Sequence, residues 1–294
     1  MKRFFLMSTL LLATMLVCAQ TKIAPNMKKG MKKVYVTEAK ISAPSKPVTT
    51  ISTETVYEVV DATADGYVLD VYVTDVKTDA KDVESRIYSL ATEMLKDVHT
   101  QYATDKDGKV TKMLNAEEGK KRINEMLDNV LDNVLAEVPQ LDKTKLSEIK
   151  KQLTGEVTDQ SLVESVQIST SPLTLNGKTI STGTEEEYNT AQGIKMKRTY
   201  TVVDKSKIQS NSIINMNADD MKEMVSGLVE KLVPNQSSNL MDMFGSMIGN
   251  LKIDASENAT YTFQKDGWIK SITSESSYSS MGVSFQMNSK VTLK

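Results

Sequence analysis

The stretch TVYEVVDATADGYVLDVYVTDVK, residues 55–77, decides the fold class. Two runs rich in valine and tyrosine flank Asp65-Gly66, a residue pair that supplies the positive backbone φ of a tight hairpin turn. Along each run one face is mostly apolar and the other is mixed, which is the period of a β-strand with one buried side. The stretch therefore predicts an antiparallel hairpin that packs one face on a core.

The chain on the N-terminal side of this hairpin is basic. Residues 20–31 carry three lysines and no acidic residue, and KKVYVTEAKI, residues 32–41, predicts a strand directly after them. A polybasic arm that touches a membrane is one interpretation of these lysines. Because they are spread along the segment rather than gathered on one face, we favour a solvated linker.

On the C-terminal side, apolar residues at helical spacing predict a long amphipathic helix over residues 115–139. Asn115 and Glu118 have the spacing of a capping box at its start. Asp128 and Asp132 lie on one face, four residues apart, but a face of this kind is normally solvated. We therefore predict no metal site there. Two further helices are predicted over residues 79–98 and 142–153, and a second hairpin that turns at Asp107-Gly108 is predicted over residues 99–114.

The second half returns to strand patterns before and after a methionine-rich segment. Strands are predicted over residues 162–170, 184–190, 194–204 and 206–216, and three more within residues 259–293, the first two of which turn at Asp266-Gly267. Within residues 184–190, three successive glutamates are expected to point to alternate faces of the strand and so to form no acid/base pair. Between them, residues 217–251 predict two adjacent amphipathic helices that present more apolar surface than they can bury against each other. We expect them to cover one face of the sheet. If they also line an apolar cleft, the candidate ligand-binding residues are Met224, Leu228, Met243 and Met247.

The first nineteen residues have the basic, apolar and small-residue zones of a secretory signal peptide. Cleavage after Ala19 discards Cys18, the single cysteine, so the mature chain has no disulfide and no thiol. The alternative is a lipoprotein anchored through Cys18, which Met15 and Val17 disfavour because they make a poor lipobox. No second apolar stretch has the length of a permanent transmembrane helix. We expect an exported protein, periplasmic or extracellular.

These patterns together predict the α+β class: a curved antiparallel β-sheet, with meanders at both ends of the chain, covered by amphipathic helices. The predicted organisation is a signal peptide at residues 1–19, a basic N-terminal linker at residues 20–31, and a single α+β domain at residues 32–294.

The composition narrows the function. A net charge of −2 argues against nucleic acid as a partner, and 5% aromatic residues disfavour a sugar-stacking platform. His99 is the single histidine, and no GxSxG, HExxH or glycine-rich phosphate loop occurs. We interpret His99 as a surface or strand residue and expect no catalytic residue and no cofactor. A hydrolase that uses carboxylates alone stays as the least favoured alternative.

The hairpin of residues 55–77 and the tail YTFQKDGWIKSITSESSY, residues 261–278, resemble an uncharacterised secreted family of Bacteroidota with a domain of unknown function. This resemblance implies an envelope location and a curved antiparallel sheet with helices, and it carries over no catalytic residue. At the level of the fold, a curved sheet covered by apolar helices is also similar to periplasmic lipoprotein carriers.

The function expected from the sequence is non-catalytic. The first hypothesis is a secreted or periplasmic envelope protein that binds an apolar or lipid-like ligand between the sheet and the helices. The alternative is a surface or assembly protein that contacts another envelope protein.

Overall fold

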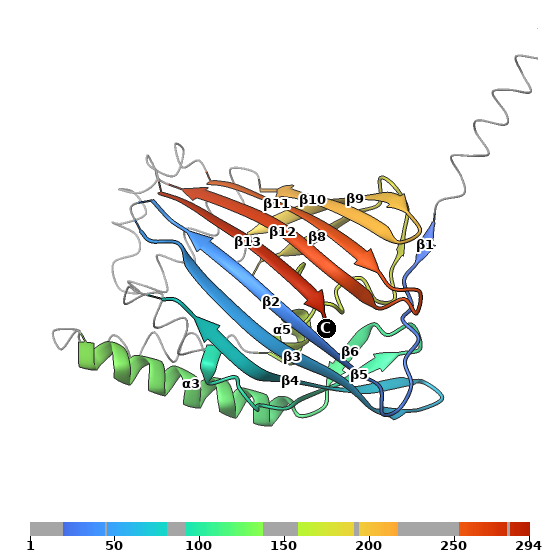
Figure 1. The fold of residues 1–294 in the computed structure, drawn as a ribbon, viewed down its shortest axis with the longest axis horizontal. Coiled ribbons are helices and arrows are strands. Elements are labelled where there is room, and N and C mark those ends of the chain that lie inside the picture. Colours follow the sequence, from blue (N-terminus) through green and yellow to red (C-terminus); the bar gives the residue numbers. More distant parts are fainter. Residues whose placement is uncertain are drawn as a thin grey trace, which may run out of the picture.

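The structure, a computed structural model, describes residues 20–44, 46–80, 92–137, 158–190, 194–216, 253–280 and 283–294. Within these residues one antiparallel sheet of eleven strands dominates, in the order β6-β5-β4-β3-β2-β13-β12-β11-β10-β9-β8 (Figure 1). The strands are β2 (Lys32–Ser42), β3 (Thr49–Ala62), β4 (Gly66–Thr78), β5 (Thr100–Asp105), β6 (Val110–Met113), β8 (Glu185–Asn189), β9 (Lys195–Asp204), β10 (Lys207–Ile214), β11 (Ile253–Phe263), β12 (Ile269–Ser280) and β13 (Val283–Leu293).

Short turns of the predicted kind connect three of the neighbouring strand pairs: β3–β4, β5–β6 and β11–β12. The β3–β4 hairpin turns at Asp65-Gly66, and a Cβ atom at Gly66 would overlap the Thr104 carbonyl of β5. Gly108 and Gly267 adopt positive φ angles of 80° and 83° in the β5–β6 and β11–β12 turns. The hairpins predicted around these three glycines are confirmed.

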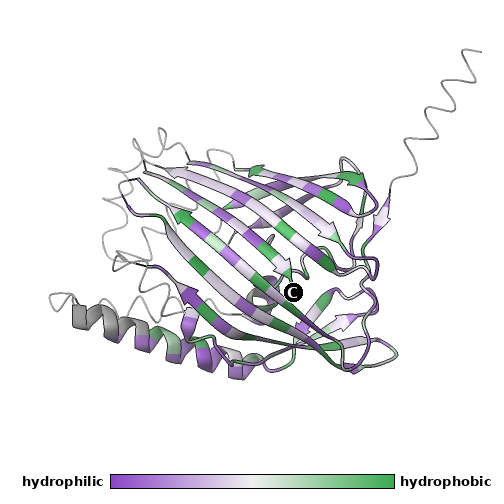
Figure 2. Ribbon diagram, viewed as in Figure 1, coloured by the Kyte–Doolittle hydropathy of each residue, from purple (hydrophilic) through white to green (hydrophobic). Residues whose placement is uncertain are grey.

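The two ends of the chain meet in the middle of the sheet. The last strand, β13, pairs antiparallel with β2, and the register places Leu293 opposite Tyr35. This pair joins the N-terminal meander β2–β6 to the C-terminal strands. Apolar and polar residues alternate along many of the strands (Figure 2), and in β9 and β10 buried and exposed residues alternate with the same period, so one face of these strands points to the core.

The apolar faces belong to one side of a curled sheet. Tyr102 on β5 and Tyr200 on β9 lie in the same buried cluster although seven strands separate β5 from β9 in the sheet order. Only a sheet that curls can bring strands so far apart in order onto one core. The core therefore lies on the concave side, and its sheet members include Tyr35, Tyr57, Val59, Leu69, Val71, Tyr261, Ile272 and Val291.

An irregular segment fills one half of this concave side. After α5 (Asp159–Glu164), the chain runs through turns to β7 (Thr179–Ile180), and all of residues 171–176 are buried. Leu173 and Leu175 are 2% and 0% exposed and belong to the main core cluster. We call residues 158–180 the plug.

The segment predicted as a solvated linker packs against the same half. Residues Thr21–Lys22 form β1, which pairs with β7 of the plug. Ile23 and Met27 are buried in the main core cluster, and Trp268 donates its indole N–H to the Asn26 carbonyl at 3.2 Å. Exposed residues, among them Lys22 and Lys28, alternate here with buried Ile23, Pro25 and Met27, so the basic segment is packed on one side.

The predicted α+β class is wrong. Among the described residues the helices are α3 (Ala116–Glu137) and α5, and the protein is mostly β. The first turns of α3 touch the core through Ala116 and Ile123, but the filling of the concave side comes from the irregular plug rather than from helices laid over the sheet. Residues 162–170, predicted as a strand, form the end of α5 and turns.

Some predicted helices lie outside the described residues: residues 142–153, residues 217–251 and most of 79–98. The predicted cap of α3 is in place but bonds differently. Asn115 precedes the helix, yet its Oδ1 accepts from the Gln101 N–H at 2.9 Å and its Nδ2 donates to the His99 carbonyl at 2.9 Å, so its side chain ties α3 to β5. No helix in the described part of the chain is long and apolar enough to cross a membrane.

Candidate functional site

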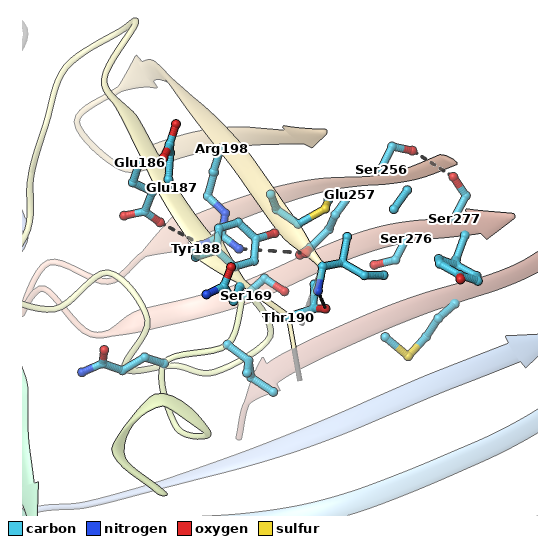
Figure 3. A pocket seen from close by; sticks show the side chains of 18 of the residues that line it. Ser169, Glu186, Glu187, Tyr188, Thr190, Arg198, Ser256, Glu257, Ser276 and Ser277 are labelled. Atoms are coloured by element: carbon cyan, nitrogen blue, oxygen red, sulfur yellow. Dashed lines mark hydrogen bonds and ion pairs between the residues drawn. The ribbon is translucent and has the colours of Figure 1, made fainter. Parts of the chain in front are cut away.

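The concave side of the sheet has a filled half and a hollow half. The plug occupies the first, whereas a cavity of about 890 Å³ lies in the second, between β8–β9 and the ends of β11, β12 and β13 (Figure 3). This volume is within the range of roughly 300–1,000 Å³ that small-molecule sites occupy. The cavity is therefore the strongest candidate site among the described residues.

One wall of the cavity is apolar and partly open to solvent. Tyr278 on β12 and Phe285 on β13 are cross-strand partners, and they are 37% and 41% exposed. They extend the same face that buries Ile272 and Val291 deeper in the sheet. An apolar face that is fully packed at one end and exposed around a cavity at the other indicates a binding surface. The other apolar lining residues are Ile168, Tyr188, Ile194, Met196, Ala255 and Met287.

The opposite wall is a charged cluster on β8, β9 and the end of the plug. Glu186 lies opposite Arg198 in the β8–β9 register, and Arg198 Nη1 donates to Glu186 Oε1 at 3.0 Å. Lys178 Nζ donates to Glu186 Oε2 at 2.6 Å. One carboxylate therefore holds two cations, one from the sheet and one from the plug.

Arg198 is fixed on all sides although it is charged. Its side chain is 4% exposed, its Nε donates to Ser212 Oγ at 3.1 Å, and its guanidinium carbon lies 4.3 Å from the centre of the Tyr188 ring. Its Nη2 is 3.9 Å from Glu257 Oε2. The planar guanidinium with several donors suits this position because it satisfies several partners at once.

Burial and charge oppose each other at Glu186. Burial acts to raise the pKa of its carboxyl, but the charge and hydrogen bond of Lys178, the Tyr200 hydroxyl and Arg198 outweigh burial, so the pKa is lowered. The pKa of Lys178 is also lowered, because burial outweighs the attraction of Glu186. The neighbouring cations therefore favour the charged form of the carboxyl, whereas burial and the attraction of Glu186 act in opposite directions on the lysine.

This arrangement is suited to holding a molecule by contact. It combines apolar side chains with a few fixed polar groups, which is the usual composition of a small-molecule site. The paired carboxylates and cations are engaged with one another. In the described part of the chain, no three His, Cys, Asp or Glu side chains come together in a group that could hold a metal ion.

The predicted ligand-binding residues Met224, Leu228, Met243 and Met247 all lie outside the described residues. Met216 directly precedes the undescribed segment that holds these residues. It is partly buried and packs against a small cluster of Ile194, Met196 and Ala255. That cluster contributes three residues to the cavity wall.

His99 lies away from the cavity. Its Nδ1 is 2.6 Å from Asp70 Oδ2, and its ring stacks on Tyr72 with centroids 4.2 Å apart. Asp70 alternates along β4 with the buried core residues Leu69 and Val71, so this group lies on the convex face. His99 is a strand-edge residue with a structural partner.

Sequence reasoning missed Arg198 and Glu186. Arg198 could have been found from the alternation of the strand. It lies between Met196 and Tyr200 on the face of β9 that points to the core. The three successive glutamates were correctly expected to alternate between faces, and the consequence is that the middle one, Glu186, points inward while Glu185 and Glu187 are exposed. Its partner depends on the β8–β9 register, which no local pattern gives.

Comparisons with known proteins give no family. No family model matches the chain, and no curated protein does. The similar solved structures include lipovitellin, from a structure describing its lipid–protein interactions, at 12% identity and a TM-score of 0.42, over 92% of this chain and 25% of that one. This chain thus spans about a quarter of the lipovitellin chain.

Two further solved structures, a channel and a porin-like protein, align with this chain over most of their length. An outer membrane channel from Pseudomonas putida F1 is 6% identical, with 92% of this chain and 97% of that one covered, at a TM-score of 0.19. A porin-like protein from Bacteroides uniformis is 9% identical, with 93% and 98% covered, at a TM-score of 0.19. At these scores the likeness assigns neither an activity nor a ligand to this chain.

Proposed function

We propose that this chain is an exported, non-catalytic binding protein that holds an apolar or amphipathic ligand in the hollow half of its concave face. One observation carries the proposal: the apolar face that Ile272 and Val291 fill at the plugged end continues to Tyr278 and Phe285, which stay exposed around a cavity of about 890 Å³. Each side chain is already more than half buried, so covering the remainder under a ligand is worth roughly 1 kcal/mol each.

The charged cluster supports binding rather than hydrolysis. A general acid or base must be free to exchange a proton with a substrate. Glu186 instead accepts from Lys178, Arg198 and Tyr200 at once. In the proposed role these groups are the fixed polar end of an otherwise apolar site.

The compartment rests on the sequence of the first nineteen residues. Intact-mass analysis of the protein recovered from its own host tests it: a mature chain that begins at Gln20 is expected. A chain that begins at an acylated Cys18 would make the protein an anchored lipoprotein instead.

A neutral fluorescent probe, N-phenyl-1-naphthylamine, tests the binding function. Saturable binding to the folded chain is expected, and Phe285→Ser should weaken it about tenfold or more, because one aromatic contact is lost. Ile213→Ser is the matched control: Ile213 is 52% exposed on the opposite face of β10, so its loss should leave probe binding unchanged. No saturable binding, or equal effects of the two variants, contradicts the proposal and leaves a protein that acts through contacts with other envelope proteins.

A further inference from the structure

The charges that line the cavity are unequal in number. Among the described residues in its lining, two are cations, Lys178 and Arg198, whereas four are carboxylates, Glu164, Glu186, Glu187 and Glu257. An anionic group that entered the cavity would meet an excess of negative charge.

Both cations are already engaged. Lys178 and Arg198 each contact a different oxygen of Glu186, at 2.6 Å and 3.0 Å. A carboxylate or phosphate head group would have to take one of these cations away from Glu186, and that would leave a partly buried glutamate with a weaker partner. The cluster is therefore closed to anions.

Glu257, unlike Glu186, has no close charged partner among the described residues of the cavity. Its side chain is 14% exposed on the concave face of β11, next to the apolar wall (Figure 3). In the described part of the chain its polar contacts are long: Arg198 Nη2 at 3.9 Å and the Ser274 hydroxyl at 3.4 Å. A carboxylate has about four acceptor positions, so most of those on Glu257 have no close donor among these contacts.

The position of Glu257 also favours contact with a ligand. Glu257 lies on the same strand and the same face as Ala255, and Ala255 is opposite Tyr278 in the β11–β12 register. A negatively charged hydrogen-bond acceptor thus lies next to the exposed apolar wall. A molecule that covers this wall with a hydrocarbon chain brings its head group to Glu257.

Resting on the proposed binding function, we propose that the ligand is a single-chain amphiphile whose head group is a cation with N–H donors, such as a primary amine. The head group donates to Glu257, and the chain covers Tyr278, Phe285 and Met287. Fatty acids of the same chain length are disfavoured.

Displacement of N-phenyl-1-naphthylamine from the wild-type protein at neutral pH tests this selectivity, with dodecylamine and dodecanoate kept below their aggregation concentrations. Dodecylamine should displace the probe at a concentration about tenfold lower than dodecanoate, because a charge-assisted hydrogen bond in a partly buried site is gained by one and denied to the other. Equal displacement, or stronger displacement by dodecanoate, overturns the inference while the binding function stands. If neither amphiphile displaces bound probe, the inference is also overturned.

Variants of Glu257 then test whether this residue causes the preference for the amine. Glu257→Gln should reduce the amine preference to about threefold or less, since the carboxylate charge is gone. Glu257→Asp, which keeps the charge, should retain the preference. The matched control is Glu275→Gln, because Glu275 is exposed on the opposite face of the neighbouring strand β12. A Glu257→Gln protein that folds and keeps the full preference shows that Glu257 does not bind the head group.

Discussion

Arg198 and Glu186 face each other across β9 and β8, and Arg198 Nη1 donates to Glu186 Oε1 at 3.0 Å from a side chain that is 4% exposed. A buried arginine on the apolar face of a strand is costly unless a partner of opposite charge is present. Glu186 also holds Lys178 of the plug. The pair therefore joins the sheet to the plug and forms the boundary between the filled and the hollow halves of the concave face.

Removing the carboxylate charge should destabilise the fold strongly. Glu186→Gln leaves Arg198 with Ser212 and the more distant Glu257, so we expect a loss of about 2–4 kcal/mol in the free energy of unfolding. Urea denaturation measures it. Glu185→Gln is the control: it removes the neighbouring glutamate, whose bond to Lys197 joins side chains 52% and 37% exposed, and should cost at most about 1 kcal/mol. Equal losses in the two variants would contradict a structural role for the inner pair.

Acid should remove this stabilisation selectively. The pKa of Glu186 in the folded protein lies below its ordinary value of 4.5. Between these two pKa values the unfolded chain binds more protons than the folded one, so stability falls as the pH decreases through this window. The difference in unfolding free energy between wild type and Glu186→Gln should be largest above pH 4.5 and shrink below it. Asp204 and Asp266, whose pKa values are also lowered, act equally in both proteins.

The hairpin that decides the fold should be intolerant of a side chain at Gly66. An alanine Cβ there would overlap the Thr104 carbonyl, and the β4–β5 register would have to shift. We expect Gly66→Ala to cost about 2 kcal/mol or more. Gly183→Ala is the comparison, because Gly183 has φ +87° but open space around it, and should cost only about 1–2 kcal/mol of backbone strain. Thermal unfolding followed by far-UV circular dichroism separates the two.

The hairpins were predictable because their signals are local. Asp-Gly at residues 65–66, 107–108 and 266–267 sits between runs of period two, and each pair forms the turn that the sequence indicates. The helix after Asn115 was predictable for the same reason. The bonding of its cap was not predictable, because the Asn115 side-chain oxygen accepts from the Gln101 N–H of β5.

The plug and the site were not predictable because they depend on distant partners. LVESVQIST reads as a strand by its alternation, yet Leu162 is buried in the core cluster with residues of β2 and β13 that lie more than a hundred residues away along the chain. The same holds for the α+β prediction, because the apolar pattern does not say whether a helix or an irregular segment covers the sheet: Leu173 and Leu175 of the plug are buried, whereas Ile168 is 56% exposed. Glu186 and Arg198 become a pair only in the β8–β9 register.

The contact between His99 and Asp70 on the convex face should contribute to stability. Asp70 is 8% exposed, its Oδ2 contacts His99 at 2.6 Å, and its Oδ1 has no partner among the described residues. His99→Ala should cost about 1–3 kcal/mol, because it leaves a buried carboxylate without its imidazole. A double-mutant cycle with Asp70→Asn measures the coupling. A coupling near zero would show that the contact contributes nothing to stability, and probe binding on the concave face should stay unchanged in every member of the cycle.

A substitution in the filled half of the concave face should reduce stability, whereas a substitution in the hollow half should reduce probe binding. Leu175 of the plug is 0% exposed in the main core cluster, so Leu175→Ala removes buried contacts and leaves a cavity, at a cost of about 2–5 kcal/mol in unfolding free energy. Phe285 is 41% exposed, so Phe285→Ala should cost much less stability. Probe affinity should respond in the opposite order, with a large loss for Phe285→Ala and little change for Leu175→Ala at a temperature where both remain folded. If Phe285→Ala destabilises the protein as much as Leu175→Ala, its ring belongs to the core, and the hollow half is packing surface rather than a binding site.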